Sequence, residues 1–172
     1  MEDPEFSHEY VIPVEKILGP RTLRIVQAPE KVQCLILRKT SDYSRGRKIG
    51  DFVALTERRS LNDSQIETLR KIITDPESYW NGWPKYRRYP PRPGFAFEIF
   101  GAKSAVHLLV DLQNPGWEFS CDHEAYNRFN FAGPRLARLA KALFPEYASP
   151  SHGSVWRQGI IKELEQAVER ST

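Results

Sequence analysis

The stretch that decides the fold runs from Gly94 to Cys121 and reads "GFAFEIFGAKSAVHLLVDLQNPGWEFSC". Two groups of turn-forming residues interrupt its apolar runs, one at 101–104 and one at 113–116. Gly, Asn, Pro and Ser are common in tight turns because they supply or tolerate the backbone angles that such turns require. The stretch therefore predicts a three-stranded antiparallel meander over about residues 95–121.

The alternation of side chains along these strands separates two faces. Folding each turn as a four-residue loop places Phe100 opposite Ala105 and Leu112 opposite Trp117, and successive residues then point to opposite faces. A slip of one residue would mix the apolar set with the polar one. We expect the uncharged face to form the core, with Cys121 as a buried thiol. That face consists of Phe95, Phe97, Ile99, Val106, Leu108, Val110, Leu112, Trp117, Phe119 and Cys121.

The opposite face gathers four carboxylates and one imidazole. In this register Glu98 and Asp122 flank His107, and Asp111 faces Glu118. Like charges directly opposite one another destabilise a sheet, so water and salt, an Arg or Lys side chain, or a metal ion should neutralise them. A histidine beside carboxylates can also act as a general acid or base. Candidate catalytic residues are therefore His107, Glu98 and Asp122, and a metal, if one binds, would use His107, Asp111, Glu118 and Asp122.

Helical patterns lie on both sides of the meander. In "LNDSQIETLRKIITDPESYW" Asn62 is placed as an N-cap, and Gln65 can complete a capping box. Pro134 fits the first turn of a second helix, which Pro145 should end. Residues 148–172 predict a third helix. The apolar stripe of the first helix comprises Leu61, Ile66, Leu69, Ile72 and Ile73.

The N-terminal part reads mainly as strands. Short extended segments are expected on both sides of a turn at Gly19-Pro20, followed by a strand over "KVQCLILRK" that is buried on both faces. The order of strands, helix, strands and helices is typical of an α+β fold. We expect an antiparallel sheet, made of the meander and N-terminal strands, packed against two or three helices.

Length and composition indicate one soluble domain. The 172 residues are 40% hydrophobic and 27% charged, with a net charge of +3. This excess alone does not require a nucleic-acid partner. Residues 1–6 could be a cloning remnant or disordered, so the domain is taken as 1–172 with that reservation. No apolar run is long enough for a membrane span, the acidic start is unlike a secretory signal, and two distant cysteines suit a reducing, cytoplasmic setting.

The loop "NGWPKYRRYPPRPGF", from Asn81 to Phe95, combines cations, aromatic rings and prolines without an acid. Cations neutralise phosphates or carboxylates, and aromatic faces stack on bases or on guanidinium planes. A second basic cluster could extend this surface; it consists of Arg45, Arg47 and Lys48, with Arg58 and Arg59 a little later. Alternatively, the arginines pair with the acidic sheet face. The candidate binding residues are Trp83, Lys85, Tyr86, Arg87, Arg88, Tyr89 and Arg92.

Four segments resemble a group of small uncharacterised bacterial α+β proteins. They are "LNDSQIETLRKIITDPESYW", "FAFEIF", "AVHLLVDL" and "RLARLAKALFPEY", within residues 61–147. That group carries cysteines near the hairpin turn, where this chain has residues 111–114, so a shared metal or redox role is not implied. The resemblance implies a fold and no activity.

The sequence thus favours a small cytoplasmic binding or inhibitor module that acts without catalysis and without a cofactor. Its partner would be a protein or nucleic acid with an acidic surface, contacted through the basic loop, and not a membrane. The alternative is a metal-assisted hydrolase that uses the histidine and carboxylates of the sheet face.

Overall fold

The computed structural model describes residues 13–39, 48–49, 52–54, 56–79, 94–111, 116–121, 124–128 and 133–148. Side chains are described for 13–37, 52–54, 56–79, 94–110 and 135–146. The described helices are α1 (Val14–Gln27), α2 (Asp63–Thr74) and α3 (Gly133–Leu143), with 3-10 turns η1 (Pro76–Ser78) and η2 (Pro145–Ala148). The described strands are β1 (Lys31–Lys39), β2 (Lys48–Ile49), β3 (Phe52–Ala54), β4 (Arg59–Ser60), β5 (Phe95–Phe100), β6 (Ala105–Asp111), β7 (Gly116–Cys121) and β8 (Glu124–Arg128).

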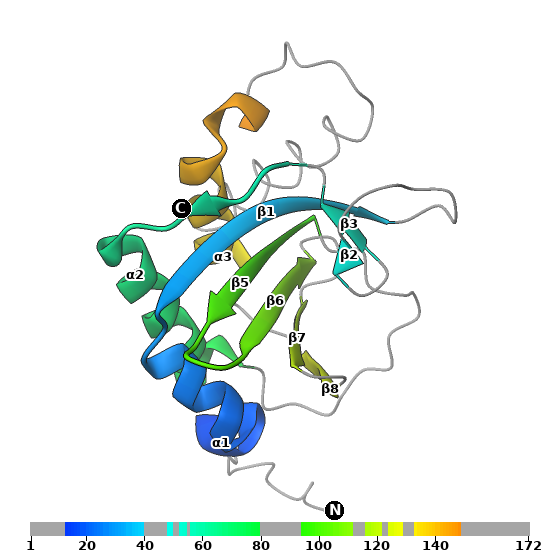
Figure 1. The fold of residues 1–172 in the computed structure, drawn as a ribbon. Coiled ribbons are helices and arrows are strands. Elements are labelled where there is room, and N and C mark those ends of the chain that lie inside the picture. The colour runs from blue at the N-terminus through cyan, green and yellow to red at the C-terminus, as the bar shows by residue number, and fades with distance from the viewer. Residues whose placement is uncertain are drawn as a thin grey trace, which may run out of the picture.

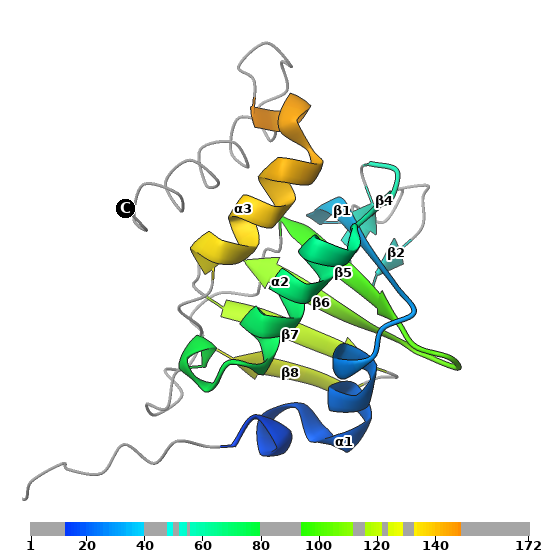
Figure 2. The same ribbon diagram turned by 90° about the vertical axis from the view of Figure 1, so that its left-hand side faces the viewer.

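The fold is α+β, as the sequence predicted, and the three helices of the described ranges pack against one antiparallel sheet. The strands follow the order β2-β3-β1-β5-β6-β7-β8, and β4 pairs with part of β1. Figure 1 shows β1 curving over the sheet, and Figure 2 shows α1, α2 and α3 on one face of it. The helices therefore bury one face of the sheet.

The core between helices and sheet contains the apolar set predicted for the meander, as far as its side chains are described. Phe95, Phe97, Ile99, Val106, Leu108 and Val110 are all buried there. The rings of Phe95 and Phe97 meet edge to face with centroids 5.8 Å apart. The predicted core residues Trp117, Phe119 and Cys121 have a described backbone only.

Local sequence signals predicted α2 and α3 correctly. Asn62 accepts a hydrogen bond from the Gln65 backbone, and the Gln65 side chain accepts one from the Asn62 backbone, which completes the capping box. The whole predicted stripe of α2 packs in the core, with Ile66 only partly buried. α3 begins at Gly133, with Pro134 in its first turn, and ends before Pro145. The helix expected at 148–172 lies outside the described residues.

The prediction of extended segments before β1 is wrong, because residues 14–27 form α1. Gly19 has φ +74° and ψ 160°, so the helix is kinked there and resumes at Pro20. Proline is accepted at the first turn of a helical segment because its missing N–H would be unpaired there in any case. The buried positions of α1 are spaced as on one helical face, at Val14, Ile17, Leu18, Thr22, Ile25 and Val26.

The meander has the predicted first hairpin and a shifted second one. Phe100 pairs with Ala105, as expected, but Asp111 pairs with Gly116. The β6–β7 register therefore differs from the predicted one by two residues, and a shift of two keeps the same alternation between the faces. Leu109, rather than Asp111, lies opposite Glu118, so the like-charge pair is avoided. The sequence had not indicated β8, which extends the sheet beyond β7.

Several of the described side chains on the face away from the helices are also buried. Leu35, Ala96 and Leu109 lie in one cross-strand row and belong to a second apolar cluster with Leu37 and Phe52. Glu98 has no exposed surface. An ionised carboxylate at such a position requires a partner from the protein, since water does not reach it.

Candidate functional site

Glu98 lies at the centre of an ion-pair network on the face away from the helices. The Arg58 guanidinium donates from Nε to one carboxylate oxygen, and Nη2 lies 3.1 Å from the other. His107, on the next strand, has its Nε2 3.3 Å from Glu98 Oε1. A carboxylate only accepts hydrogen bonds, so Nε2 carries the proton in this contact. The hypothesis that an arginine neutralises the acidic face holds for Glu98.

The network fixes the ionisation of Glu98. Burial alone would raise the pKa of this carboxyl, but the hydrogen bonds from His107 and Arg58 outweigh burial and lower the pKa to about 2. Glu98 is therefore a carboxylate throughout the neutral range. Such a low pKa makes it a poor proton acceptor, and a fixed negative charge beside an imidazole serves chiefly to orient that ring.

The structure brings together two of the three predicted catalytic residues. Glu98 and His107 are Cα partners across β5 and β6. The position opposite His107 on β7 is Ser120, not the predicted Asp122, because of the two-residue shift in register. Asp122 lies outside the described residues. Asp111 and Glu118 are described as backbone only, and they pair with Gly116 and Leu109, not with each other.

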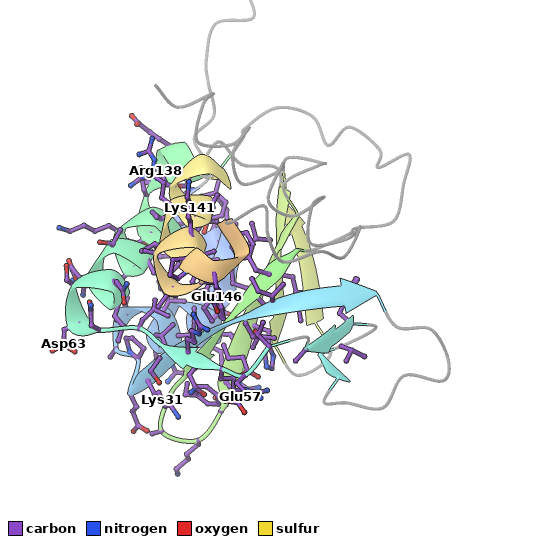
Figure 3. All side chains as sticks on the ribbon, turned by 90° about the horizontal axis from the view of Figure 1, so that it is seen from above. Lys31, Glu57, Asp63, Arg138, Lys141 and Glu146 are labelled. Atoms are coloured by element: carbon purple, nitrogen blue, oxygen red, sulfur yellow. The ribbon has the colours of Figure 1, made fainter. Side chains whose placement is uncertain are left out.

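Arg59 points to the other face of the sheet. It is the Cα partner of Cys34, and its Nη1 donates to the Leu143 carbonyl at the end of α3. The same guanidinium pairs with both oxygens of Glu146, 2.9 Å from one of them, and lies 4.5 Å from the centroid of the Phe144 ring. Figure 3 shows Glu146 beside the β4 ribbon. Arg58 and Arg59 are therefore both engaged within the fold. Arg58 pairs with the acidic sheet face, as the alternative hypothesis held, whereas Arg59 pairs with Glu146 after α3.

A basic pocket lies between α1 and the turn that joins β5 to β6. Its volume is about 420 Å³. Among the lining residues that the structure describes, three are cationic and none is acidic, and we call this site the α1–turn pocket. Its lining residues are Arg21, Arg24, Ile25, Ala28, Gly101, Ala102, Lys103 and Ser104.

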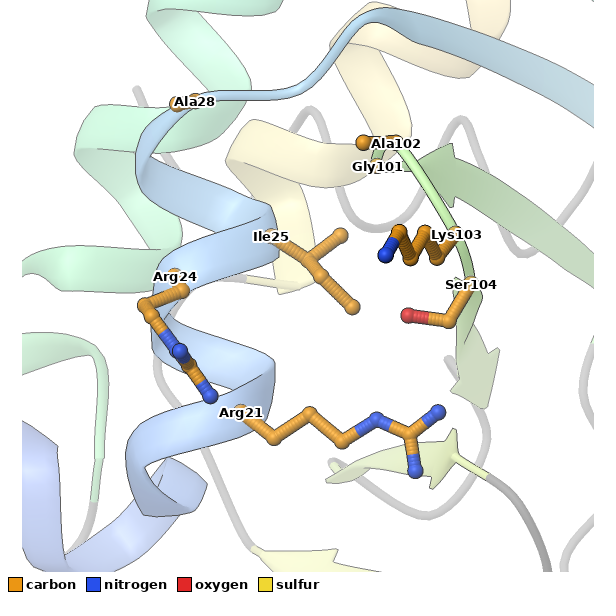
Figure 4. A pocket seen from close by; sticks show the side chains of 8 residues that line it. All are labelled: Arg21, Arg24, Ile25, Ala28, Gly101, Ala102, Lys103 and Ser104. Carbon is orange, nitrogen blue, oxygen red and sulfur yellow. The ribbon is translucent and has the colours of Figure 1, made fainter.

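The polar ends of the α1–turn pocket come from two elements. Figure 4 shows the Lys103 ammonium and the Ser104 hydroxyl directed toward α1, while the Arg21 guanidinium extends from α1 beneath Ser104. Arg24 donates from Nε to the Pro20 carbonyl at 3.3 Å, so its side chain lies along the helix. All three cations are exposed. Cationic side chains from two elements thus line the described part of this pocket, and clustered cations attract anions.

Sequence reasoning missed this pocket for a definite reason. Arg21 and Arg24 were placed on an extended segment, where an odd separation of three residues puts side chains on opposite faces. On a helix the same separation puts them on one face. The missed signal was the helical spacing of the apolar residues of α1.

The residues predicted to bind a partner, from Trp83 to Arg92, lie outside the described residues. Within the described part of the chain, no three His, Cys, Asp or Glu side chains gather closely enough to hold a metal ion. Cys34 is fully buried, and burial raises the pKa of its thiol far above the ordinary range. Of the helices in the described ranges, none combines the length and apolarity that a membrane crossing needs. Comparison with protein families, with curated proteins and with solved structures finds no match for this chain.

Proposed function

We propose that this protein is a small non-catalytic binding module that contacts an anionic macromolecular partner through basic side chains. The observation that carries the proposal is the α1–turn pocket, where the exposed cations Arg24 and Lys103 come from two elements and lie among described lining residues that also include Arg21. Arg58 and Arg59 are neutralised by Glu98 and Glu146, so they serve the fold rather than a partner.

The Glu98 network gives weaker support to an enzyme. A hydrolase built there would use His107 as its reactive group, because the low pKa of Glu98 makes that carboxylate an orienting group rather than a base. Both oxygens of Glu98 are already occupied by Arg58. The network therefore resembles a structural ion pair more closely than a site that exchanges protons with a substrate.

Charge reversal in the pocket tests the proposal. The probes are a fluorescent single-stranded 20-mer oligonucleotide and a fluorescent poly-glutamate peptide, with binding measured by anisotropy at several salt concentrations. Arg21→Glu/Lys103→Glu should weaken binding of the preferred probe about tenfold or more, because each lost cation removes an attraction and each new acid adds a repulsion.

A matched control separates the pocket from net charge. Lys16→Glu/Lys71→Glu reverses two exposed cations that do not line the pocket, and it changes the net charge by the same amount. We expect a loss below about threefold, since a remote exposed charge acts mainly through long-range, salt-screened fields. Equal losses in the two double variants, or no binding of either probe by the wild type, would overturn the proposal.

The basic loop is a second contact that we propose from the sequence. Arg87→Glu/Arg88→Glu should weaken binding of the same probe without lowering the melting temperature, since exposed cations contribute little to folding. If the double variant unfolds instead, these arginines are internal ion-pair partners and the loop is part of the fold.

A further inference from the structure

The sheet face away from the helices is accessible near the β5–β6 turn and buried farther along the strands. Leu35, Ala96 and Leu109 form one buried cross-strand row. In the next two rows toward the turn, the described side chains of β1, β5 and β6 are exposed or partly exposed, except that of Glu98. We call the accessible set the open patch, which consists of Lys31, Gln33, Phe100, Ala105 and His107.

Two aromatic rings of the open patch lie on neighbouring strands. Phe100 pairs with Ala105, and His107 pairs with Glu98, so the two rings are diagonal neighbours across β5 and β6. Such positions are about 7–8 Å apart in an antiparallel pair. Phe100 is partly exposed, and the His107 side chain is 29% exposed. Both rings therefore offer a face to a planar ligand.

The Glu98 network holds one of these rings in place. His107 Nε2 lies 3.3 Å from Glu98 Oε1, and Arg58 bonds both oxygens of the same carboxylate. Because Glu98 is buried, the imidazole is anchored from below the accessible surface. A ring that is held before binding loses less conformational entropy when a ligand stacks on it. The buried ion pair thus has a use on this face beyond the neutralisation of a carboxylate.

We propose that the open patch binds single-stranded nucleic acid by stacking two bases, one on the Phe100 ring and one on the His107 ring. The inference rests on the proposed function and names the class of its macromolecular partner. Aromatic side chains on neighbouring strands of a sheet are a known means of holding successive bases, and every base has a face that can stack. The exposed Lys31 ammonium, 5.9 Å from the centroid of the Phe100 ring, binds the adjacent phosphate.

The charges around the open patch favour stacking over a purely electrostatic contact. Lys31 adds one positive charge beside Phe100, and the charge of Arg58 is balanced by Glu98. Glu57, next to Arg58, is exposed and adds a negative charge. The described charges of this region therefore nearly cancel. Rings rather than cations should supply the preference for a single strand, whose bases are available for stacking.

A peptide fits this place less well than a base does. Peptides commonly bind a sheet by adding a strand to a free edge. β5, which carries Phe100, is paired over its whole length with β1 on one edge and with β6 on the other. It therefore offers no free edge to a peptide backbone, whereas a base approaches the ring from the face of the sheet.

Fluorescent oligonucleotides of about ten nucleotides test the inference on the full chain. The probes are single-stranded oligodeoxythymidine, the same sugar–phosphate backbone without bases, and a hairpin duplex, with binding measured by anisotropy at several salt concentrations. We expect the single strand to bind at least about tenfold more tightly than the base-free backbone, because stacking requires a base. The duplex should also bind more weakly, because its bases are already stacked on one another.

Variants assign the contacts. Phe100→Ala and His107→Gln should each weaken binding of the single strand about tenfold and leave the base-free backbone nearly unchanged, whereas Phe100→Tyr keeps a ring and should retain binding. Glutamine at position 107 still carries a side-chain N–H for Glu98, so its effect reports on the ring. Lys31→Gln should reduce the slope of log affinity against log salt by about 0.7, as loss of one phosphate contact does, while the control Lys71→Gln on α2 should leave the affinity unchanged.

Amide NMR shifts of the wild type make the test independent of how well the variants fold. On addition of the single strand we expect the largest shifts at Phe100, Ala105 and His107. Equal affinity for the single strand and the base-free backbone, or shifts confined to other parts of the chain, would overturn the inference. So would a proline-rich peptide that shifts the same three amides and displaces the oligonucleotide.

The charge-reversal variant of the pocket separates this inference from the proposed function. Binding that is lost in Arg21→Glu/Lys103→Glu and kept in Phe100→Ala would support the proposed function and reject the open patch. Binding that is lost in Phe100→Ala and kept in the pocket variant would support the open patch and reject the pocket as the contact. Binding of poly-glutamate without binding of the single strand would keep an anionic partner and reject nucleic acid.

Discussion

Arg58 and Arg59 are neighbours in the sequence and have opposite environments. Arg58 meets Glu98, whose side chain is only 1% exposed, on the face away from the helices. Arg59 meets Glu146 on the helix side, where the two side chains are 42% and 34% exposed. The residue types are the same, but the two ion pairs differ in their exposure to solvent. The cost of losing each arginine should therefore depend on the carboxylate that it leaves behind.

The cations of the α1–turn pocket form a third group. Arg24 and Lys103 are exposed and line a pocket whose described residues include no acid. In that order, Arg58, Arg59 and these two cations run from a buried acid, through a partly exposed acid, to no acid among the described lining residues. Stability effects should decrease along this series, while effects on a bound anion should appear only at its end.

The largest effect is expected for Arg58→Ala. Removing one partner of a buried ion pair leaves an uncompensated charge, so the free energy of unfolding should fall by about 3–4 kcal/mol. Urea denaturation measures this. The double variant Arg58→Met/Glu98→Leu should recover most of the loss, because it removes the buried charge together with its partner. A double variant as unstable as Arg58→Ala would show that packing, not charge, explains the loss.

Acid should weaken the same contact. The pKa of Glu98 is about 2 in the folded protein against an ordinary value of 4.5, so its contribution is present above pH 4.5 and is lost as the pH falls toward 2. A shift of this size corresponds to about 3 kcal/mol. The stability difference between the wild type and Glu98→Gln, measured by denaturant at pH 6 and pH 3, should shrink with acid. A difference independent of pH would contradict the role of the charge.

Arg59→Ala should cost about 1–2 kcal/mol in the free energy of unfolding. The variant loses a partly exposed ion pair, a hydrogen bond to the Leu143 carbonyl and the contact with the Phe144 ring. Arg59→Lys should be almost as destabilising, because lysine lacks the planar fork that bonds a carboxylate through two nitrogens. Thermal or urea unfolding of both variants gives the comparison. A cost equal to that of Arg58→Ala would show that exposure does not decide these energies.

The smallest effect is expected for Lys103→Gln. An exposed cation with no acid among the described residues of its pocket should change the free energy of unfolding by less than about 0.5 kcal/mol. The same urea measurement checks this, alongside the binding experiments above. A loss above about 1 kcal/mol would make Lys103 a structural residue and would remove it from the series as a binding cation.

The parts of the fold that could be predicted from the sequence are those that depend on interactions between neighbouring residues. Asn62 and Gln65 form a capping box within one turn, and the hairpin at 101–104 needs only its own residues. The second hairpin shows the limit of such signals. Residues 112–116 allow loops that differ by one position, and both alternatives keep the same apolar face, so the pattern could not choose between them.

The parts of the site that sequence could not predict depend on distant or hidden partners. Arg58 and Glu98 are 40 residues apart in the sequence. The other arginines and acids of the chain offered many equivalent pairings. His107 beside Glu98 was predictable because one hairpin joins them. The α1–turn pocket was missed because Gly19-Pro20 looked like a turn between strands, and the helix that continues through it was overlooked.

The Thr56 side chain helps to protect the sheet from pairing with a second molecule. β1 pairs on one side with β4 at Gln33 and Cys34 and with β3 from Leu37 onward. Between them the Ile36 N–H donates to the Thr56 hydroxyl at 3.0 Å. A side chain thus closes the gap that two short strands leave along a strand of nine residues. An open gap at that place would expose unpaired backbone to a strand of a second molecule, which is how aggregation through sheet edges begins.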